Sequence, residues 1–164
     1  MKAVFRAEDG RGAKTVLTDI YLEHMDYDHV MDMRDDFLDN PQKEYDLSVV
    51  PELLRAAAVG DKVAAAIINR QGEELGVSAC AVIRGLKLEQ TVFDVVLAGS
   101  VIVKEPQEQM FRIIKNKVNA VAPNARIQKL EEPPVMGAIL RAMDEYKLSV
   151  SELIWENLRK TTNI

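Results

Sequence analysis

Residues 93–103 read Phe93-Asp94-Val95-Val96-Leu97-Ala98-Gly99-Ser100-Val101-Ile102-Val103. The apolar run before the small residues is short and rich in β-branched side chains, so it predicts a strand buried on both faces, as in a parallel sheet. Ala98-Gly99-Ser100 then turns the chain with almost no side-chain bulk, which lets another group approach the backbone closely. That group could be a nucleotide, although small residues are also common in ordinary strand-to-helix turns.

The composition of the chain limits the kinds of partner it can have. Its 164 residues, 48% of them hydrophobic, suffice for a single domain with its own core. The net charge of -5 and the lack of a basic cluster argue against binding to nucleic acid or to a membrane. No apolar run is long enough to span a bilayer, and residues 1–6 do not resemble a signal peptide. The single cysteine, Cys80, leaves no internal disulfide, so we expect a reduced, cytoplasmic protein.

The rest of the chain predicts helices on both sides of this strand. Upstream, apolar spacing indicates helices at 1–8, after Thr15, within 23–39 and over 47–58. A long helix is expected from the N-cap Asp61 to Arg84, with an inner stripe of Val63, Ala64, Ile67, Ile68, Leu75, Ala79, Val82 and Ile83. Downstream, a strand at 91–97 is followed by a helix at 107–121, a strand at 126–130, and helices at 135–146 and 150–158.

The order strand, helix, strand, helix predicts a right-handed βαβα unit. Two parallel strands do not make a stable sheet alone, and no other stretch of the chain is convincing as a strand. We therefore expect an open sheet edge and uncovered apolar helix faces, which another surface must cover.

Four motifs resemble one known family in their order and spacing. They are Ala56-Ala57-Ala58-Val59-Gly60-Asp61-Lys62-Val63-Ala64, Glu74-Leu75 in the helix that follows, Val95-Val96-Leu97-Ala98-Gly99-Ser100-Val101, and Pro133-Pro134-Val135-Met136-Gly137-Ala138. The chain resembles the C-terminal part of an N-acetylglucosamine kinase or BadF/BadG/BcrA/BcrD-type ATPase, within the actin, sugar-kinase and Hsp70 superfamily. Residues 5–18 also resemble the stretch after the helix behind the nucleotide in these enzymes, so the resemblance covers most of residues 1–146.

This resemblance implies a helix-rich α/β fold, the C-terminal lobe of an actin-like (ribonuclease H-like) ATPase domain with a small, incomplete parallel sheet and about six helices. Residues 1–148 would form the nucleotide-side lobe, and residues 149–164 a C-terminal amphipathic helix. The turn Ala98-Gly99-Ser100-Val101 corresponds to the adenosine motif, and Gly137 would pack its helix close to the same pocket. The N-terminus of the helix after the turn would favour negative charge. The implied ligand is ATP or ADP, with Mg²⁺ in intact relatives.

Intact relatives also carry a phosphate loop of the form Asp-Gly-Gly-Gly-Thr-Lys and a catalytic aspartate that acts as general base toward the sugar hydroxyl, and neither precedes Met1. Phosphoryl transfer needs phosphates, metal and nucleophile held together, so we expect no catalytic residue, no metal site and no activity in this chain alone. We expect it to self-associate or to dock to a separate first lobe, helped by Val150, Leu153, Trp155 and Leu158. The alternative function is a non-catalytic, helix-rich binding or scaffold module that retains the fold.

Two other motifs have simpler explanations than a functional site. Asp9-Gly10-Arg11-Gly12-Ala13-Lys14-Thr15 imitates a phosphate loop, but the bulky Arg11 replaces a glycine and the residues after Thr15 follow a helical period. The stretch from His24 to Asp32 holds two histidines and several aspartates. The spacing of the histidines is poor for one helix face and no glycine shapes a calcium loop, which favours a solvated acidic surface.

Overall fold

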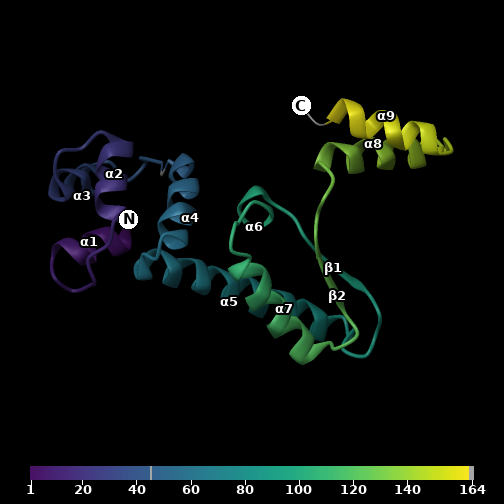
Figure 1. The fold of residues 1–164 in the computed structure, drawn as a ribbon, viewed down its shortest axis with the longest axis horizontal. Coiled ribbons are helices and arrows are strands. Elements are labelled where there is room, and N and C mark those ends of the chain that lie inside the picture. The colour runs from purple at the N-terminus through teal and green to yellow at the C-terminus, as the bar shows by residue number, and fades with distance from the viewer. Residues whose placement is uncertain (45, 163–164) are drawn as a thin grey trace.

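Helices make up most of the structure, and one small sheet joins them in the second half of the chain (Figure 1). The computed structural model describes residues 1–44 and 46–162. The first half forms α1 (Lys2–Glu8), α2 (Leu17–Met25), α3 (Val30–Asp39), the 3-10 helix η1 (Leu47–Val49), α4 (Val50–Ala58) and α5 (Lys62–Gly85). The second half forms β1 (Asp94–Leu97), α6 (Ser100–Val103), α7 (Gln109–Val121), β2 (Arg126–Lys129), α8 (Pro134–Glu145) and α9 (Glu152–Thr162).

These elements confirm a helix-rich α/β structure and the predicted order of strand, helix, strand and helix. The described residues hold nine α-helices, compared with the about six expected. Eight of them lie where apolar spacing predicts a helix, and the ninth is the single-turn α6, which follows the turn after β1 directly. No helix in the described part of the chain is both long and apolar enough to cross a membrane.

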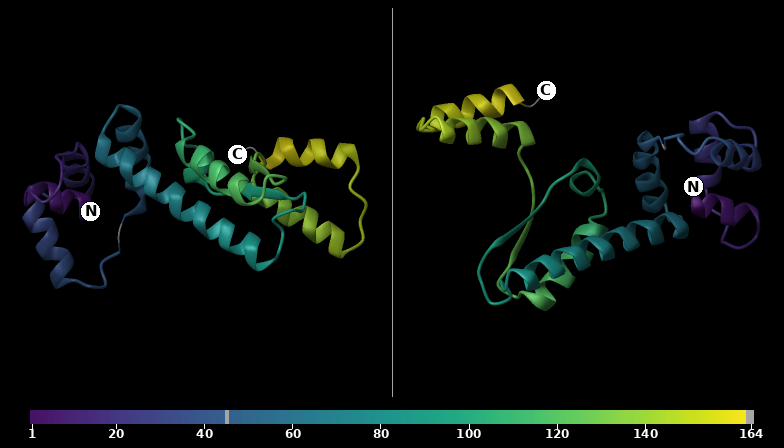
Figure 2. Two further views of the ribbon diagram at one scale, coloured as in Figure 1. Left: turned by 90° about the horizontal axis from the view of Figure 1, so that it is seen from below. Right: turned by 180° about the vertical axis from the view of Figure 1, so that it is seen from behind.

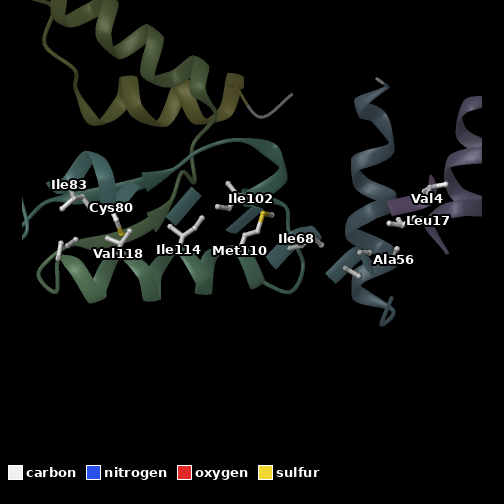
Figure 3. Packing of buried hydrophobic residues seen from close by; sticks show 14 of the residues in the cluster. Val4, Leu17, Ala56, Ile68, Cys80, Ile83, Ile102, Met110, Ile114 and Val118 are labelled. Atoms are coloured by element: carbon white, nitrogen blue, oxygen red, sulfur yellow. The ribbon is translucent and has the colours of Figure 1, made fainter. Parts of the chain in front are cut away.

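The long helix α5 packs along α7 through a stripe of small residues. Its buried positions recur every three or four residues, at Ala64, Ile68, Gly72, Gly76, Cys80 and Ile83. Figure 3 shows Ile68, Cys80 and Ile83 together with Met110, Ile114 and Val118 of α7. A Cβ atom on Gly72 would lie 3.2 Å from the Met110 Cα, so the two helix backbones approach each other closely.

The inner stripe expected for α5 is therefore partly wrong. Ala64, Ile68 and Ile83 are buried as predicted. Three larger residues expected inside are partly exposed, with exposed fractions of 38% for Ile67, 40% for Leu75 and 61% for Val82. Close contact with α7 requires small side chains, so the buried face runs through Gly72 and Gly76 and leaves the larger residues at its margin.

The two strands form a parallel sheet in which Asp94–Leu97 lie opposite Arg126–Lys129. Val95 and Leu97 pack against the core, whereas Val96 is 48% exposed. The prediction that β1 is buried on both faces is wrong, because its side chains alternate between the core and solvent. Within the described residues the sheet has only these two strands, so its outer edges are unpaired, as expected.

The N-terminal helices α1, α2 and α3 pack together and against α4. Val4 of α1, Leu17 of α2 and Met33 of α3 are almost completely buried. Figure 3 shows Val4 and Leu17 beside Ala56 of α4. This group therefore supports α4, the helix that leads into α5.

Asp61 connects the N-terminal helices to the start of α5. Its Oδ1 accepts a hydrogen bond from the Ala64 backbone N–H at 2.8 Å, which confirms Asp61 as the N-cap of α5. Its Oδ2 accepts hydrogen bonds from the Thr15 hydroxyl and the Val16 backbone N–H, both at 2.9 Å. Burial alone would raise the pKa of Asp61, but these hydrogen bonds outweigh it and hold the pKa below its ordinary value.

We expect Asp61→Ala to lower the free energy of unfolding by about 1–2 kcal/mol, because it removes a helix cap and the partner of the Thr15 hydroxyl. Asp61→Asn should cost less, since an amide oxygen can still cap α5. Urea unfolding of both variants, followed by far-UV circular dichroism, measures the difference. Equal stability of Asp61→Ala and the wild type would contradict this role.

Asp36 lies in a polar cluster near the end of α3. Its carboxylate accepts hydrogen bonds from the Lys43 ammonium group, the Tyr27 hydroxyl and, at 2.6 Å, the Asn40 amide. The Lys43 and Tyr27 hydrogen bonds are the main reason why the pKa of Asp36 is lowered from 3.8 to about 2. The cluster holds the residues after α3 against that helix.

This cluster should make stability depend on pH in acid. Above about pH 4 the Asp36 carboxylate is charged in both the folded and unfolded states, so its contribution is complete, and it is lost as the pH falls through about 2. We expect Asp36→Asn to be less stable than the wild type at about pH 7 and to approach it at about pH 2, in urea unfolding. Asp35→Asn is the matched control, since Asp35 pairs with its neighbour Arg34. A gap for Asp36→Asn that stays constant with pH would contradict the prediction.

The hairpin of α8 and α9 ends the described chain, and it confirms the two helices predicted at 135–146 and 150–158. Figures 1 and 2 show the hairpin standing away from α5 and α7, with β2 leading into it. Met136 of α8 is buried, and an ion pair between Arg159 and Glu132, at 2.8 Å, connects α9 to the residues before α8. Tyr146, between the two helices, is exposed.

Candidate functional site

The turn after β1 depends on a glycine. Gly99 has a φ of 113° and a ψ of 138°, a conformation that residues with a side chain rarely adopt. Its carbonyl oxygen accepts a hydrogen bond from the Val103 backbone N–H at 3.0 Å, which closes the single turn of α6. The glycine that the sequence places at position 99 is therefore required by the backbone.

This turn forms one wall of a cavity of about 470 Å³. Ala98, Gly99, Ser100 and Val101 all line it, so four of the five predicted binding residues lie together. α4 contributes Val50, Leu53 and Leu54, and α5 contributes Ile67, Ile68, Gln71 and Leu75. Ile102 and Met110 complete the lining. Cavities that hold small molecules are typically of this size, roughly 300–1,000 Å³.

The lining of this cavity is mostly apolar. Gln71 and Ser100 supply the polar side chains of its lining, and none of the described residues that line it is charged. Neither polar side chain makes a hydrogen bond with another described residue. The amide of Gln71 offers both donors and an acceptor. The cavity therefore suits a flat, largely apolar group with a polar edge.

A second cavity, of about 640 Å³, adjoins the first. Val50, Leu54, Ser100 and Val101 line both, so the two cavities form one groove between α4 and α6. The second cavity differs in carrying cations, from Arg55 and Lys104. Leu47, Ser48, Pro51 and Pro106 complete its lining.

Gly137, the fifth predicted binding residue, lies elsewhere. It is exposed on α8 and does not line either cavity. A Cβ atom built on it would meet nothing within 4 Å, so the close packing expected at Gly137 is not found. The reason is that α8 packs against α9 in the hairpin, away from α5 and α7 (Figure 1).

The N-terminus of α7 holds a negative group from the chain itself. Glu105 is 5% exposed, and its two carboxylate oxygens accept hydrogen bonds from the backbone N–H groups of Gln109 and Met110, at 2.8 and 2.9 Å. This helix end therefore does favour negative charge, as expected, but Glu105 already occupies it, so it is not open to a ligand. Glu105 lies two positions before the predicted start of this helix and four before its observed start, and an acidic residue just before a predicted helix is the sequence signal that could have identified this cap.

His24 contacts η1 and the residue before it, as a structural rather than a catalytic residue would. His24 Nε2 lies 2.9 Å from Asp46 Oδ2 and 2.7 Å from Ser48 Oγ. Both partners meet the same ring nitrogen, whereas nucleophilic catalysis uses one nitrogen for the serine and the other for the aspartate. Across residues 1–44 and 46–162, no group of three or more His, Cys, Asp or Glu side chains is arranged to hold a metal ion.

No protein-family model, curated protein or solved structure matches this chain. The groove between α4, α5 and the turn at 98–101 is the feature of the described structure that points to a function.

Proposed function

We propose that this chain binds an adenine nucleotide, as the nucleotide-side lobe of an ATP-dependent N-acetylglucosamine or other amino-sugar kinase. The observation that carries the proposal is the convergence of Ala98, Gly99, Ser100 and Val101 on one apolar cavity. These residues match the adenosine motif of the family that the chain resembles. A helix-rich fold with a two-stranded parallel sheet is compatible with the C-terminal lobe of an actin-like ATPase domain.

The lining of the cavity suits an adenine ring. The glycine turn leaves backbone free of side chains on one wall, so a flat ring can lie against it. Ile67 and Leu75 present apolar surface from α5, and Gln71 lies between them on the same helix. A carboxamide can both donate to and accept from the polar edge of adenine.

Catalysis would require more than this lobe. Phosphoryl transfer depends on holding the phosphates, Mg²⁺ and the sugar hydroxyl in line. We assign no catalytic residue here, and we expect turnover only when a first lobe supplies the phosphate loop and the catalytic aspartate. With that lobe, the reaction would be transfer of the terminal phosphate of ATP to a sugar hydroxyl.

A second candidate function is a binding or scaffold module that has kept the fold without the chemistry. Exposed apolar side chains near the groove favour it, because they would be buried by a protein partner. Leu47 is 76% exposed at the second cavity, and Val101 and Leu75 are each 40% exposed. A second copy of the chain or a separate first lobe would be such a partner.

Isothermal titration calorimetry with ADP and GDP separates the two candidates, and Gln71→Leu tests the contact. We expect ADP to bind, GDP to bind more weakly, and Gln71→Leu to weaken ADP binding about tenfold, since it removes the hydrogen-bonding edge at nearly constant volume. Gln42→Leu, at an exposed position that lines neither cavity, is the matched control. No heat with either nucleotide, together with a concentration-dependent dimer in sedimentation velocity, would support the scaffold function instead.

A further inference from the structure

The groove between α4 and α6 changes in character along its length. Its first part, formed with α5, has an uncharged lining, and its second part carries Arg55 and Lys104. Ser100 and Val101 line both parts, so a ligand against the glycine turn lies next to the cationic part. Within residues 1–44 and 46–162, no carboxylate lines either part.

The two cations have little competition for an anionic ligand. Across the described residues, Lys104 forms no ion pair with another side chain. The guanidinium of Arg55 pairs with Glu52 one turn earlier in α4, and its side chain is 72% exposed. Such exposed pairs are weak, so a phosphate group can displace the carboxylate at small cost. The buried carboxylate nearby, Glu105, points its oxygens at the backbone of α7.

We propose that Arg55 and Lys104 bind the phosphate tail of the nucleotide whose base occupies the first part of the groove. This inference rests on the proposed nucleotide binding and adds the orientation of the nucleotide. The base lies toward α5, and the phosphates lie toward η1 and Pro106. The ligand class is a nucleoside diphosphate or triphosphate, selected over the nucleoside by charge. A lysine ammonium and an arginine guanidinium are the usual partners of phosphate oxygens, through short, charge-assisted hydrogen bonds.

If the phosphates lie at Arg55 and Lys104, the glycine-containing residues 9–15 have no role in binding them. Asp9 there pairs with Arg11 through the guanidinium group, at 2.8 Å from Nε. Lys14 lies in that segment and lines neither cavity. Lys14→Gln is therefore a matched control that removes one positive charge outside the groove.

Calorimetric titration of the full chain with adenosine and with ADP tests the assignment. We expect ADP to bind more tightly than adenosine in the wild type, and the preference to shrink as salt is added. Lys104→Gln and Arg55→Gln should each weaken ADP binding about tenfold, ~1.4 kcal/mol, and leave adenosine binding unchanged. Lys14→Gln should change neither.

Several results would overturn the assignment, and they distinguish it from the proposed function. If adenosine binds but ADP binds no tighter, or if Lys104→Gln and Arg55→Gln leave ADP affinity unchanged, the phosphate assignment fails and the base site stands. If Lys14→Gln alone weakens ADP binding, the phosphates lie at residues 9–15 instead. If neither adenosine nor ADP binds, the proposed function and this inference both fail.

Discussion

Replacing Gly72 by leucine should lower the free energy of unfolding by about 2–3 kcal/mol, the largest loss of stability that we expect from a single change in this core. A Cβ atom at this position would lie 3.2 Å from the Met110 Cα and 3.3 Å from the Ile113 Cβ. The first of these is backbone, which cannot rotate away as the end of a side chain can. A leucine would therefore push α7 away from α5.

The design of this experiment uses two further glycine variants. Gly72→Ala should be nearly neutral, because the gain in helix propensity, about 1 kcal/mol, offsets part of the overlap. Gly85→Ala is the control, since nothing lies within 4 Å of its Cβ position at the end of α5. It should be as stable as the wild type or up to about 1 kcal/mol more stable. A Gly72→Leu protein with the urea midpoint of the wild type would contradict the close packing.

The same substitution should also affect the groove. Ile68 of α5 and Met110 of α7 line the first cavity, and both lie near Gly72 on the packed face of α5 and α7. Separating the helices would move these two walls apart. We therefore expect Gly72→Leu to lose ADP affinity together with stability, whereas Gly85→Ala should keep both.

Gly99→Val should abolish most nucleotide binding while leaving most of the fold intact. Valine would strain the backbone here, because the φ of 113° is outside the range of a β-branched residue. It would not clash with a neighbour, because nothing lies within 4 Å of the Cβ position. Strain of this kind is worth of order 1–3 kcal/mol, and the exposed turn can relieve it by moving. The relaxed turn would no longer present Ala98 and Ser100 to the cavity.

Calorimetry and far-UV circular dichroism together measure this effect. We expect ADP affinity to fall by at least about tenfold in Gly99→Val, with helix content unchanged. Gly137→Ala is the matched control, since Gly137 lies in α8 with open space around it. It should bind ADP as the wild type does and gain up to about 1 kcal/mol of stability. Full ADP affinity in Gly99→Val would show that the turn is not part of the site.

Local patterns predicted every described element except the single-turn α6. Helical spacing and the Asp61 cap predicted α5 to within a residue at each end, and the β-branched run and its glycine turn predicted β1. Which faces of these elements are buried was harder to predict, because burial depends on packing between segments far apart in the sequence. Gly72 and Gly76 interrupt an otherwise apolar helix pattern, yet they form its tightest contact. Whether β1 is covered on one face or two depends on the number of paired strands, which no local signal in β1 contains.

In the candidate site too, residues with a local sequence signal were predicted, and residues brought in by packing were not. The turn at 98–101 carries its own sequence signal, and it does line the cavity. Gln71, Arg55 and Lys104 were missed, because single polar residues on helices α4 and α5 or after α6 have no distinctive spacing. Only the packing of α4 and α5 against the turn brings them to one groove. Gly137 was included from the resemblance, and its place on the α8–α9 hairpin depends on how that hairpin leaves the sheet.

Mapping of ADP binding by amide chemical shifts tests the central claim most directly. In two-dimensional nitrogen–proton spectra of the labelled chain, titration with ADP should shift the amide signals of Ala98, Gly99, Ser100 and Val101 and the side-chain amide of Gln71, while Gly137 stays unchanged. Saturable shifts confined to the groove are the predicted result. An absence of shifts at ADP concentrations in the millimolar range, or shifts centred on residues 9–15 or on α8, would contradict a nucleotide site at the turn after β1.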